Sequence, residues 1–329
     1  MPLITRSSYR PPALIVNGHL QTILTSLLRR VDGVGYRRER ITTPDDDFLD
    51  LDWSVCGRDR LVVLCHGLEG STEAVYMRGM VRLFNRAGWD ALGINFRGCS
   101  GTPNRRVRSY HSGATADLAT VLQHVRRMAA YPRIGLVGFS LGGNLVLKYL
   151  GETAERLDAD IRWAAAVSVP CDLKDGALAM ARPACRIYMA RFLRTLCAKA
   201  RAKADMSDGW LRAEDFVGLR TFREFDDRYT APAHGFKDAE DYWRRCSARF
   251  YVGRIRIPTL LINARNDPFL GPRCYPADEA RQSDWFHLEI PASGGHVAFL
   301  PPGVTGDFWH EHRVMAFAEE QDGSRNGCA

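Results

Sequence analysis

Short apolar runs separated by helix-like stretches are the feature that most constrains how this chain can fold. Six runs have the length and composition of buried strands: Leu61–Cys65, Ala91–Phe96, Arg133–Phe139, Trp163–Val169, Thr259–Asn263 and Phe286–Ile290. Runs this short and apolar are typical of strands covered on both faces of a parallel sheet. Strands that alternate with helices form βαβ units. The pattern therefore predicts an α/β fold with a mostly parallel central sheet.

The segments around these runs predict the helices and one hairpin. Three amphipathic helices are expected: one capped by Ser71 or Thr72 that runs to Gly88, one over Ala114–Ala130 and one over Asn144–Leu157. A further helix-like segment covers Asp307–Glu319 near the C-terminus. Upstream of the first buried run, residues 36–55 alternate in polarity around a turn at 44–47, which predicts an antiparallel hairpin at the sheet edge.

The stretch from residue 170 to residue 251 breaks this alternation. It has no clear strand pattern and is rich in Arg, Lys and Ala. Within it, Arg186–Lys203 is predicted to be a basic helix, with apolar positions at Ile187, Tyr188, Phe192, Leu193 and Leu196. We interpret residues 170–251 as a helical cap inserted into an α/β core that is formed by residues 1–169 and 252–329.

Charge and cysteine content narrow the class of protein. The formal net charge is +7 and the sequence pI is about 9.0, but no nucleic-acid-binding motif accompanies this charge, so no nucleic-acid partner is expected. The nine cysteines are scattered without a C-x-x-C pair, which favours reduced thiols. The first eight residues have no apolar signal-peptide core, and no apolar stretch approaches the roughly 18–20 residues of a membrane span. These features predict a cytoplasmic protein.

A G-x-S-x-G sequence, Gly138–Gly142, predicts the nucleophile. It follows the apolar run that ends at Phe139 and opens a helix-like stretch, and this strand–turn–helix setting is the one that makes the motif a nucleophile elbow. The flanking glycines leave room for a sharp turn that lifts the serine out of the sheet. Ser140 is therefore the predicted nucleophile, with an incidental serine in a tight turn as the alternative.

The sequence His66–Gly70 follows the first buried run and predicts the oxyanion hole. In a fold with a nucleophile elbow, this loop supplies one backbone N–H, and the residue after the nucleophile supplies the other. We assign these donors to the backbones of Leu68 and Leu141.

The remaining members of a catalytic triad are expected later in the chain, the acid before the histidine. His296 follows two glycines after the last apolar run, and Asp267 follows the run before it. Asp267 is predicted to orient the His296 ring, and Asp172 is a rival acid one strand earlier. His287 lies within a strand-like run, where packing is the expected role. His310 and His312 form no H-E-x-x-H pattern, so neither a metal nor a cofactor is expected.

These motifs together resemble the YheT-like family of α/β-hydrolases. The matching segments are Asn17–Thr22, His66–Gly70, Asn95–Cys99, Tyr110–Gly113 with Asp117, Gly138–Asn144, Glu224–Asp227, Asn266–Phe269 and Gly294–His296. The family is related to the abhydrolase-domain esterases and phospholipases and to the medium-chain fatty-acid ethyl ester synthase/esterases. The resemblance implies an α/β-hydrolase fold and carboxylic-ester hydrolysis, with lipid-like esters among the candidate substrates.

Several residues in these segments are expected to have structural roles. His19 is expected to pack or cap, and Arg97 to form a buried ion pair or to fix a turn. Asp226 and Asp227 are expected to take part in salt bridges.

The intact set of Ser140, Asp267 and His296 favours a serine esterase that works through an acyl-enzyme. An acyltransferase or ester synthase would use the same acyl-enzyme with an alcohol as acceptor, and a non-catalytic binding protein is the third alternative. The basic residues of the predicted cap helix form either a solvated face or a contact with an anionic membrane. They are Arg186, Arg191, Arg194, Lys199, Arg201 and Lys203.

Overall fold

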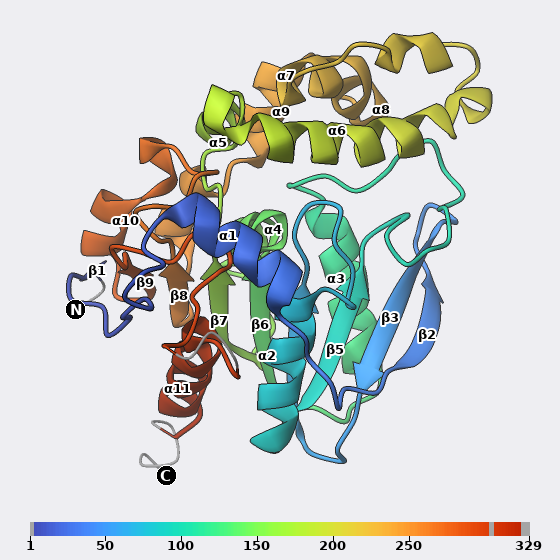
Figure 1. Cartoon of the computed structure of the whole chain (residues 1–329). Helices are drawn as coiled ribbons and strands as arrows, with labels where there is room; N and C mark the ends of the chain where they lie inside the picture. The colour runs from blue at the N-terminus through green and yellow to red at the C-terminus, as the bar shows by residue number, and fades with distance from the viewer. Residues whose placement is uncertain (1–2, 303–305, 324–329) are drawn as a thin grey trace.

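A computed structural model describes residues 3–302 and 306–323. The described residues form a nine-stranded sheet of order β1-β9-β8-β7-β6-β4-β5-β3-β2 (Figure 1). The strands are β1 (Leu3–Ile4), β2 (Arg37–Thr42), β3 (Phe48–Ser54), β4 (Arg60–Cys65), β5 (Asp90–Asn95), β6 (Arg133–Phe139), β7 (Ile161–Val167), β8 (Thr259–Ile262) and β9 (Phe286–Glu289). Strand β3 is antiparallel to both of its neighbours, whereas the pairings from β5 through to β1 are parallel. The predicted parallel sheet and its edge hairpin are therefore confirmed.

Helices cover both faces of this sheet. They are α1 (Gly18–Leu28), α2 (Val75–Arg86), α3 (Thr115–Arg127), α4 (Leu141–Thr153), α5 (Leu173–Met180), α6 (Arg186–Arg201), α7 (Phe222–Phe225), α8 (Ala231–His234), α9 (Ala239–Cys246), α10 (Ala277–Arg281) and α11 (Trp309–Gly323). Helices α2 and α11 pack on one face, and α3 and α4 pack on the other. Among the described residues, no helix is both long and apolar enough to cross a bilayer.

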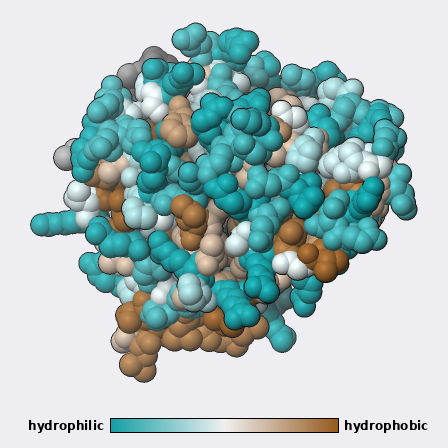
Figure 2. All heavy atoms as spheres, turned by 90° about the horizontal axis from the view of Figure 1, so that it is seen from above, coloured by the Kyte–Doolittle hydropathy of each residue, from teal (hydrophilic) through white to brown (hydrophobic). Residues whose placement is uncertain are grey.

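Helix α1 was not predicted, and it lies along the outside of the molecule in front of the sheet (Figure 1). Asn17 caps it, because its side-chain oxygen accepts a hydrogen bond from the N–H of Leu20 at 3.1 Å. Seen from above, the same side of the molecule carries a broad hydrophobic patch, at the lower edge of Figure 2.

The predicted N-terminal cap of α2 is wrong. The helix begins at Val75, and no side chain caps it. Thr72 is instead fully buried, and its hydroxyl donates a hydrogen bond to the carboxylate of Asp52 at 2.5 Å. Thr72 therefore joins the loop before α2 to strand β3 rather than starting the helix.

Helices α5 to α9 lie between β7 and β8 in the chain and gather above the ends of the strands (Figure 1). The predicted basic helix corresponds to α6, which ends at Arg201. Of its apolar positions, Leu193 is buried, whereas Ile187 is 81% exposed and does not pack against the core.

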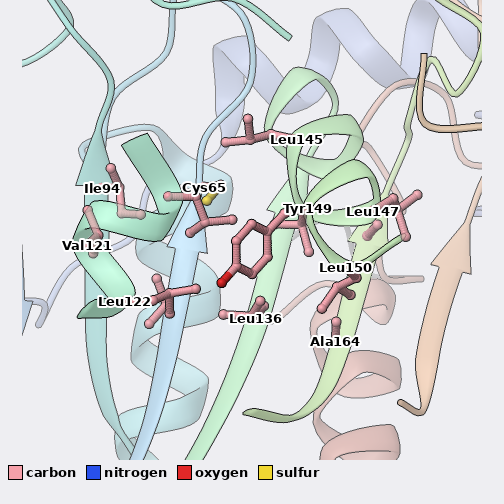
Figure 3. Close-up of a cluster of buried hydrophobic side chains, with 14 of the residues drawn as sticks. Cys65, Ile94, Val121, Leu122, Leu136, Leu145, Leu147, Tyr149, Leu150 and Ala164 are labelled. Atoms are coloured by element: carbon pink, nitrogen blue, oxygen red, sulfur yellow. The ribbon is translucent and has the colours of Figure 1, made fainter. Parts of the chain in front are cut away.

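The core under α3 and α4 fixes the position of the helix that follows β6. Figure 3 shows side chains of α3 and α4 pointing onto strands β4, β6 and β7. The residues in contact include Val121, Leu122, Leu145, Tyr149 and Leu150 from the helices and Cys65, Leu136 and Ala164 from the strands. Fully burying one such side chain contributes about 1.5–3 kcal/mol to stability. This packing holds the first turn of α4 at the end of β6.

Candidate active site

Ser140 occupies a strained turn between β6 and α4. Its φ is +51° and its ψ is −116°, a combination that residues with a side chain rarely adopt. A Cβ atom on Gly138 would lie 2.4 Å from the carbonyl oxygen of Gly142, and one on Gly142 would lie 2.4 Å from that of Cys65. Both contacts are prohibitively short, so the two glycines are required for the chain to pass through this turn. The geometry is that of a nucleophile elbow.

The structure brings Ser140, His296 and Asp267 into one line of hydrogen bonds. The Nε2 atom of His296 lies 3.0 Å from the Oγ atom of Ser140. Its Nδ1 atom lies 2.9 Å from Oδ2 and 3.1 Å from Oδ1 of Asp267. Because an ionised carboxylate can only accept, Nδ1 carries the proton and Nε2 is left to accept the proton of the serine hydroxyl.

Asp267 is fixed by one further hydrogen bond, and an aromatic ring covers its partner His296. Its side chain is fully buried, and it also accepts a hydrogen bond from the N–H of Phe269 at 2.9 Å. The Phe269 ring covers the His296 ring, with centroids 4.2 Å apart. The pair is therefore shielded from water on the side of Phe269, which strengthens the interaction between the carboxylate and the imidazole.

The rival acid, Asp172, has a different role. It is the N-cap of α5, where it accepts a hydrogen bond from the N–H of Asp175, and it forms an ion pair with Arg273 at 2.7 Å. Among the described residues, no hydrogen bond links Asp172 to His296. Its position at the end of β7 is explained by capping and charge pairing.

Among the described residues, no hydrogen bond links His19, His287 or His310 to Ser140. His287 is half-buried in β9 against Phe317, and its burial lowers its pKa. His310 is buried in α11. His19 stacks on Tyr188, as its expected packing role requires. Within residues 3–302 and 306–323, no group of three or more His, Cys, Asp or Glu side chains could hold a metal ion.

The loop after β4 presents one unused backbone donor beside Ser140. The N–H of Gly67 donates to the hydroxyl of Tyr76 at 2.9 Å, and the N–H of Glu69 donates to that of Tyr110 at 2.8 Å. The N–H of Leu68, between them, has no acceptor among the described residues. At the start of α4, the N–H of Leu141 belongs to the first turn, which has no intrahelical acceptor. Leu68, Leu141 and Ser140 line the same cavity, so the two predicted donors face one space.

His66, in this loop, has a structural role. Its Nδ1 atom lies 2.7 Å from the carbonyl oxygen of Gly67, and its Nε2 atom accepts a hydrogen bond from the N–H of Phe96 at 3.2 Å. Burial lowers its pKa to about 4. The neutral His66 ring therefore joins the loop to the end of β5.

The loop that carries His296 is held by α1, a role that the sequence analysis missed. The N–H of Gly294 donates to the side-chain oxygen of Gln21 at 3.0 Å, and the N–H of His296 donates to the hydroxyl of Thr22 at 2.9 Å. Between them, the N–H of Gly295 donates to the side-chain oxygen of Asn266 at 3.0 Å. Three consecutive N–H groups of the histidine loop are thus fixed by side chains. The signal was the segment Asn17–Thr22, for which we expected packing or capping only at His19.

A cavity that is partly open to solvent extends from Ser140 between the sheet and helices α5, α6, α7 and α9. Most of its lining from these helices is apolar: Leu173, Ala177, Met180, Phe192, Leu196, Phe222, Phe225 and Trp243. The sequence did not reveal which residues would line it, because they come from separate short helices.

Asp226 also lines this cavity, and its expected salt bridge is absent from the described structure. One oxygen of Asp226 accepts a hydrogen bond from the indole of Trp243 at 2.8 Å, and burial raises its pKa to about 7. Asp227 accepts a hydrogen bond from the N–H of Ala239 at 2.7 Å and has no ion pair among the described residues. The prediction that both carboxylates form salt bridges is therefore wrong. They act as hydrogen-bond acceptors that join the π-helical turn at 226–230 to α9.

Arg97, in contrast, forms the ion pairs expected of it. The guanidinium is buried and lies 2.7 Å from a carboxylate oxygen of Asp45, 3.2 Å from Asp47 and 2.6 Å from Asp117. These contacts join the turn of the edge hairpin to the loop after β5 and to α3. The three carboxylates compensate the charge of the guanidinium, which allows an arginine to be buried at this position.

The basic residues of α6 and the turn after it do not form one exposed face. The ammonium group of Lys203 is buried and donates to the side-chain oxygen of Asn104 at 2.6 Å. Lys199 lies 2.9 Å from the carboxylate of Glu69, in the predicted oxyanion loop. Lys203 therefore contacts the core instead of solvent, and Lys199 is only partly exposed. The four arginines of the set remain exposed: Arg186, Arg191, Arg194 and Arg201.

Comparison with known proteins agrees with this geometry. Residues 60–301 match the family model described as alpha/beta hydrolase fold. The chain is 38% identical over 306 residues to the protein named "Putative esterase YheT" of Escherichia coli K12, covering 91% of this chain and 89% of that one. It is 28% identical to phospholipase ABHD3 of Homo sapiens, over 91% of this chain and 75% of the human protein.

Among solved structures, the esterase PF2001 of Pyrococcus furiosus superposes with a TM-score of 0.60 at 19% identity, covering 90% of this chain and 97% of that one. This likeness concerns the fold. The family match over residues 60–301 and the identity to YheT show that the chain belongs to the α/β-hydrolase family, in its YheT-like group.

Proposed function

We propose that the protein is a serine hydrolase that cleaves carboxylic esters through an acyl-enzyme. The observation that carries the proposal is the hydrogen-bonded series from Asp267 through His296 to Ser140, with the two backbone N–H groups beside it. A carboxylate, an imidazole and a hydroxyl in this order make the hydroxyl oxygen nucleophilic at neutral pH.

The proposed reaction has two halves. Oγ of Ser140 attacks the ester carbonyl carbon while His296 Nε2 takes the hydroxyl proton, and the oxyanion accepts hydrogen bonds from the N–H groups of Leu68 and Leu141. His296 then gives this proton to the leaving alcohol as the C–O bond breaks, which leaves the acyl group on Ser140. A water molecule repeats both steps and releases the acid. Loss of one oxyanion donor in such enzymes costs about 3–4 kcal/mol of transition-state stabilisation.

The apolar cavity supports esters of medium-chain or lipid-like acids as the substrate class. Its wall of aliphatic and aromatic side chains can accept an acyl chain by excluding water from it. The relative named phospholipase ABHD3 is consistent with this class. In this proposal residues 170–251 act as a cap that forms the acyl-binding wall, and the rest of the chain forms the core.

The test is the hydrolysis of p-nitrophenyl acetate, butyrate, octanoate and laurate by the wild type and by Ser140→Ala. We expect hydrolysis that is fastest for one of the longer esters and is lost in the variant. A wild type that turns over none of the four esters, in the presence or absence of an added alcohol, contradicts the proposal. Ester formation that exceeds hydrolysis when alcohol is added would identify an acyltransferase instead.

A further inference from the structure

Helix α1 buries its polar side and exposes its apolar side. Its buried residues, Gly18, Gln21 and Thr25, follow one another at helical spacing. Leu20, Ile23, Leu27 and Leu28 of the same helix are exposed. A helix on the surface of a globular protein normally has the reverse arrangement. Gln21 is buried because its side chain accepts a hydrogen bond from the loop that carries His296. No role within the described part of the chain accounts for the exposure of the leucines.

The apolar surface continues into the segment before the helix. Leu14 is 92% exposed, and Val16 is also exposed. We name the set the α1 apolar patch; its members are Leu14, Val16, Leu20, Ile23, Leu27 and Leu28. Figure 2 shows hydrophobic atoms gathered without interruption on the side where α1 lies in Figure 1. Single exposed leucines are ordinary, but a contiguous patch of this kind marks a binding surface.

The segments that precede and follow the patch in the chain carry three exposed arginines. Arg6, Arg10 and Arg30 are exposed, and none of them forms an ion pair with a described carboxylate. The first acidic residue of the chain is Asp32, so residues 1–31 carry no negative side chain. An apolar helix face flanked by arginines is complementary to the headgroup region of a membrane that contains anionic lipids.

The patch lies close to the active site. The ring of His19 in α1 stacks on Tyr188 of α6 with centroids 5.8 Å apart. Tyr188 packs against Phe269 at 4.9 Å, and Phe269 covers His296. A surface that contacts the patch therefore lies a few side chains away from the catalytic histidine.

We propose that the α1 apolar patch docks the protein on the surface of membranes that contain anionic lipids. Its leucines enter the boundary between headgroups and acyl chains, and Arg6, Arg10 and Arg30 face the lipid phosphates. Docking does not depend on the proposed esterase activity. With that activity, docking brings the cavity to esters that reside in the membrane.

The experiment measures binding of the full chain to vesicles of phosphatidylcholine, with and without phosphatidylglycerol, by flotation and without substrate. We expect binding that requires phosphatidylglycerol and weakens as salt is added. The triple variant Leu14→Ser, Leu27→Ser, Leu28→Ser should bind roughly tenfold or more weakly, because three apolar side chains no longer enter the lipid. The matched control is Val55→Ser with Val217→Ser, which changes exposed apolar residues outside the patch and should bind as the wild type does.

Circular dichroism and the thermal midpoint check that the variants fold. If the triple variant is unstable, Leu14→Asp alone, in the loop before α1, should still weaken vesicle binding. The proposal is overturned if the wild type does not bind these vesicles, or if folded patch variants bind as well as the control. A self-association in sedimentation velocity that the patch variants abolish, without vesicle binding, would assign the patch to a second copy of the chain.

Discussion

The two sides of Ser140 are built by different forces. On the side of His296, side chains and backbone groups from the loop after β8, the loop after β9 and α1 are joined by hydrogen bonds with defined donors and acceptors. On the side of the cavity, helices α5 to α9 contribute mainly apolar contacts. Hydrogen bonds fix direction, whereas apolar contacts fix shape and volume. The comparison predicts that changes on the first side affect the rate of the chemical step, and changes on the second affect which ester is accepted.

The largest expected effect separates the two candidate acids. Asp267→Asn should lower kcat by about 10⁴, because an amide can no longer hold the proton on Nδ1 of His296. Asp172→Asn, the matched control, keeps a side-chain oxygen for the cap and should lower stability by less than about 1 kcal/mol, through the lost charge pairing with Arg273. Steady-state kinetics and thermal unfolding of both variants test this. Equal losses of kcat would remove the distinction between the acids.

The next substitution tests whether α1 positions His296 for the chemical step. Thr22→Val removes the acceptor for the N–H of His296 while keeping the volume of the side chain. We expect kcat to fall by roughly tenfold to a hundredfold with a small change in KM, because a misplaced histidine affects only the reacting geometry. Thr22→Ser restores a hydroxyl and should recover most of the rate. A loss that appears in KM alone, or that serine does not rescue, would contradict a positioning role.

A third substitution tests whether the apolar cavity binds the acyl chain of the ester. Met180→Trp adds volume to the apolar wall at the end of α5. We expect the ratio of kcat/KM for laurate over butyrate to fall by roughly tenfold, since one or two methylenes in an apolar site are worth about 1–3 kcal/mol. The ratio is measured with the p-nitrophenyl series. An unchanged ratio would show that the acyl chain lies elsewhere.

The smallest effect concerns Asp226, the one carboxyl group in the cavity lining whose pKa burial raises to about 7. In the unfolded chain its pKa returns to the ordinary value for aspartate, so the folded state holds the proton more tightly. Between these two pKa values, the contribution of Asp226 to the free energy of unfolding falls as pH rises. Urea unfolding at several pH values should show this fall in the wild type and a flatter profile in Asp226→Asn. Identical profiles would mean that Asp226 titrates normally.

The sequence predicted the features that depend on neighbours along the chain. The strands other than β1, the elbow at Gly138–Gly142 and the order of Ser140, Asp267 and His296 all follow from local patterns. The role of α1 could not be found this way, because Gln21 and the N–H of Gly294 meet only after the fold brings together positions 273 residues apart.

Two further predictions were wrong because tertiary contacts changed the roles of local patterns. Threonine is a common helix cap, but the hydroxyl of Thr72 instead donates a buried hydrogen bond to Asp52. Asp226 and Asp227 look like ion-pair residues, yet α9 offers an indole N–H and a backbone N–H instead of a cation. The cavity lining could not be predicted from the sequence, because its side chains come from several short helices. Local periodicity does not specify how such helices pack together.

The most direct test of the account is to locate a covalent adduct. The wild type, a heat-denatured sample and Ser140→Ala are treated with a fluorophosphonate, and peptides are mapped by mass spectrometry. The account predicts one adduct on Ser140 of the folded wild type and none in the other two samples, because only the folded triad activates this serine. No adduct on Ser140 of the folded protein, or equal labelling after denaturation, would contradict the catalytic assignment.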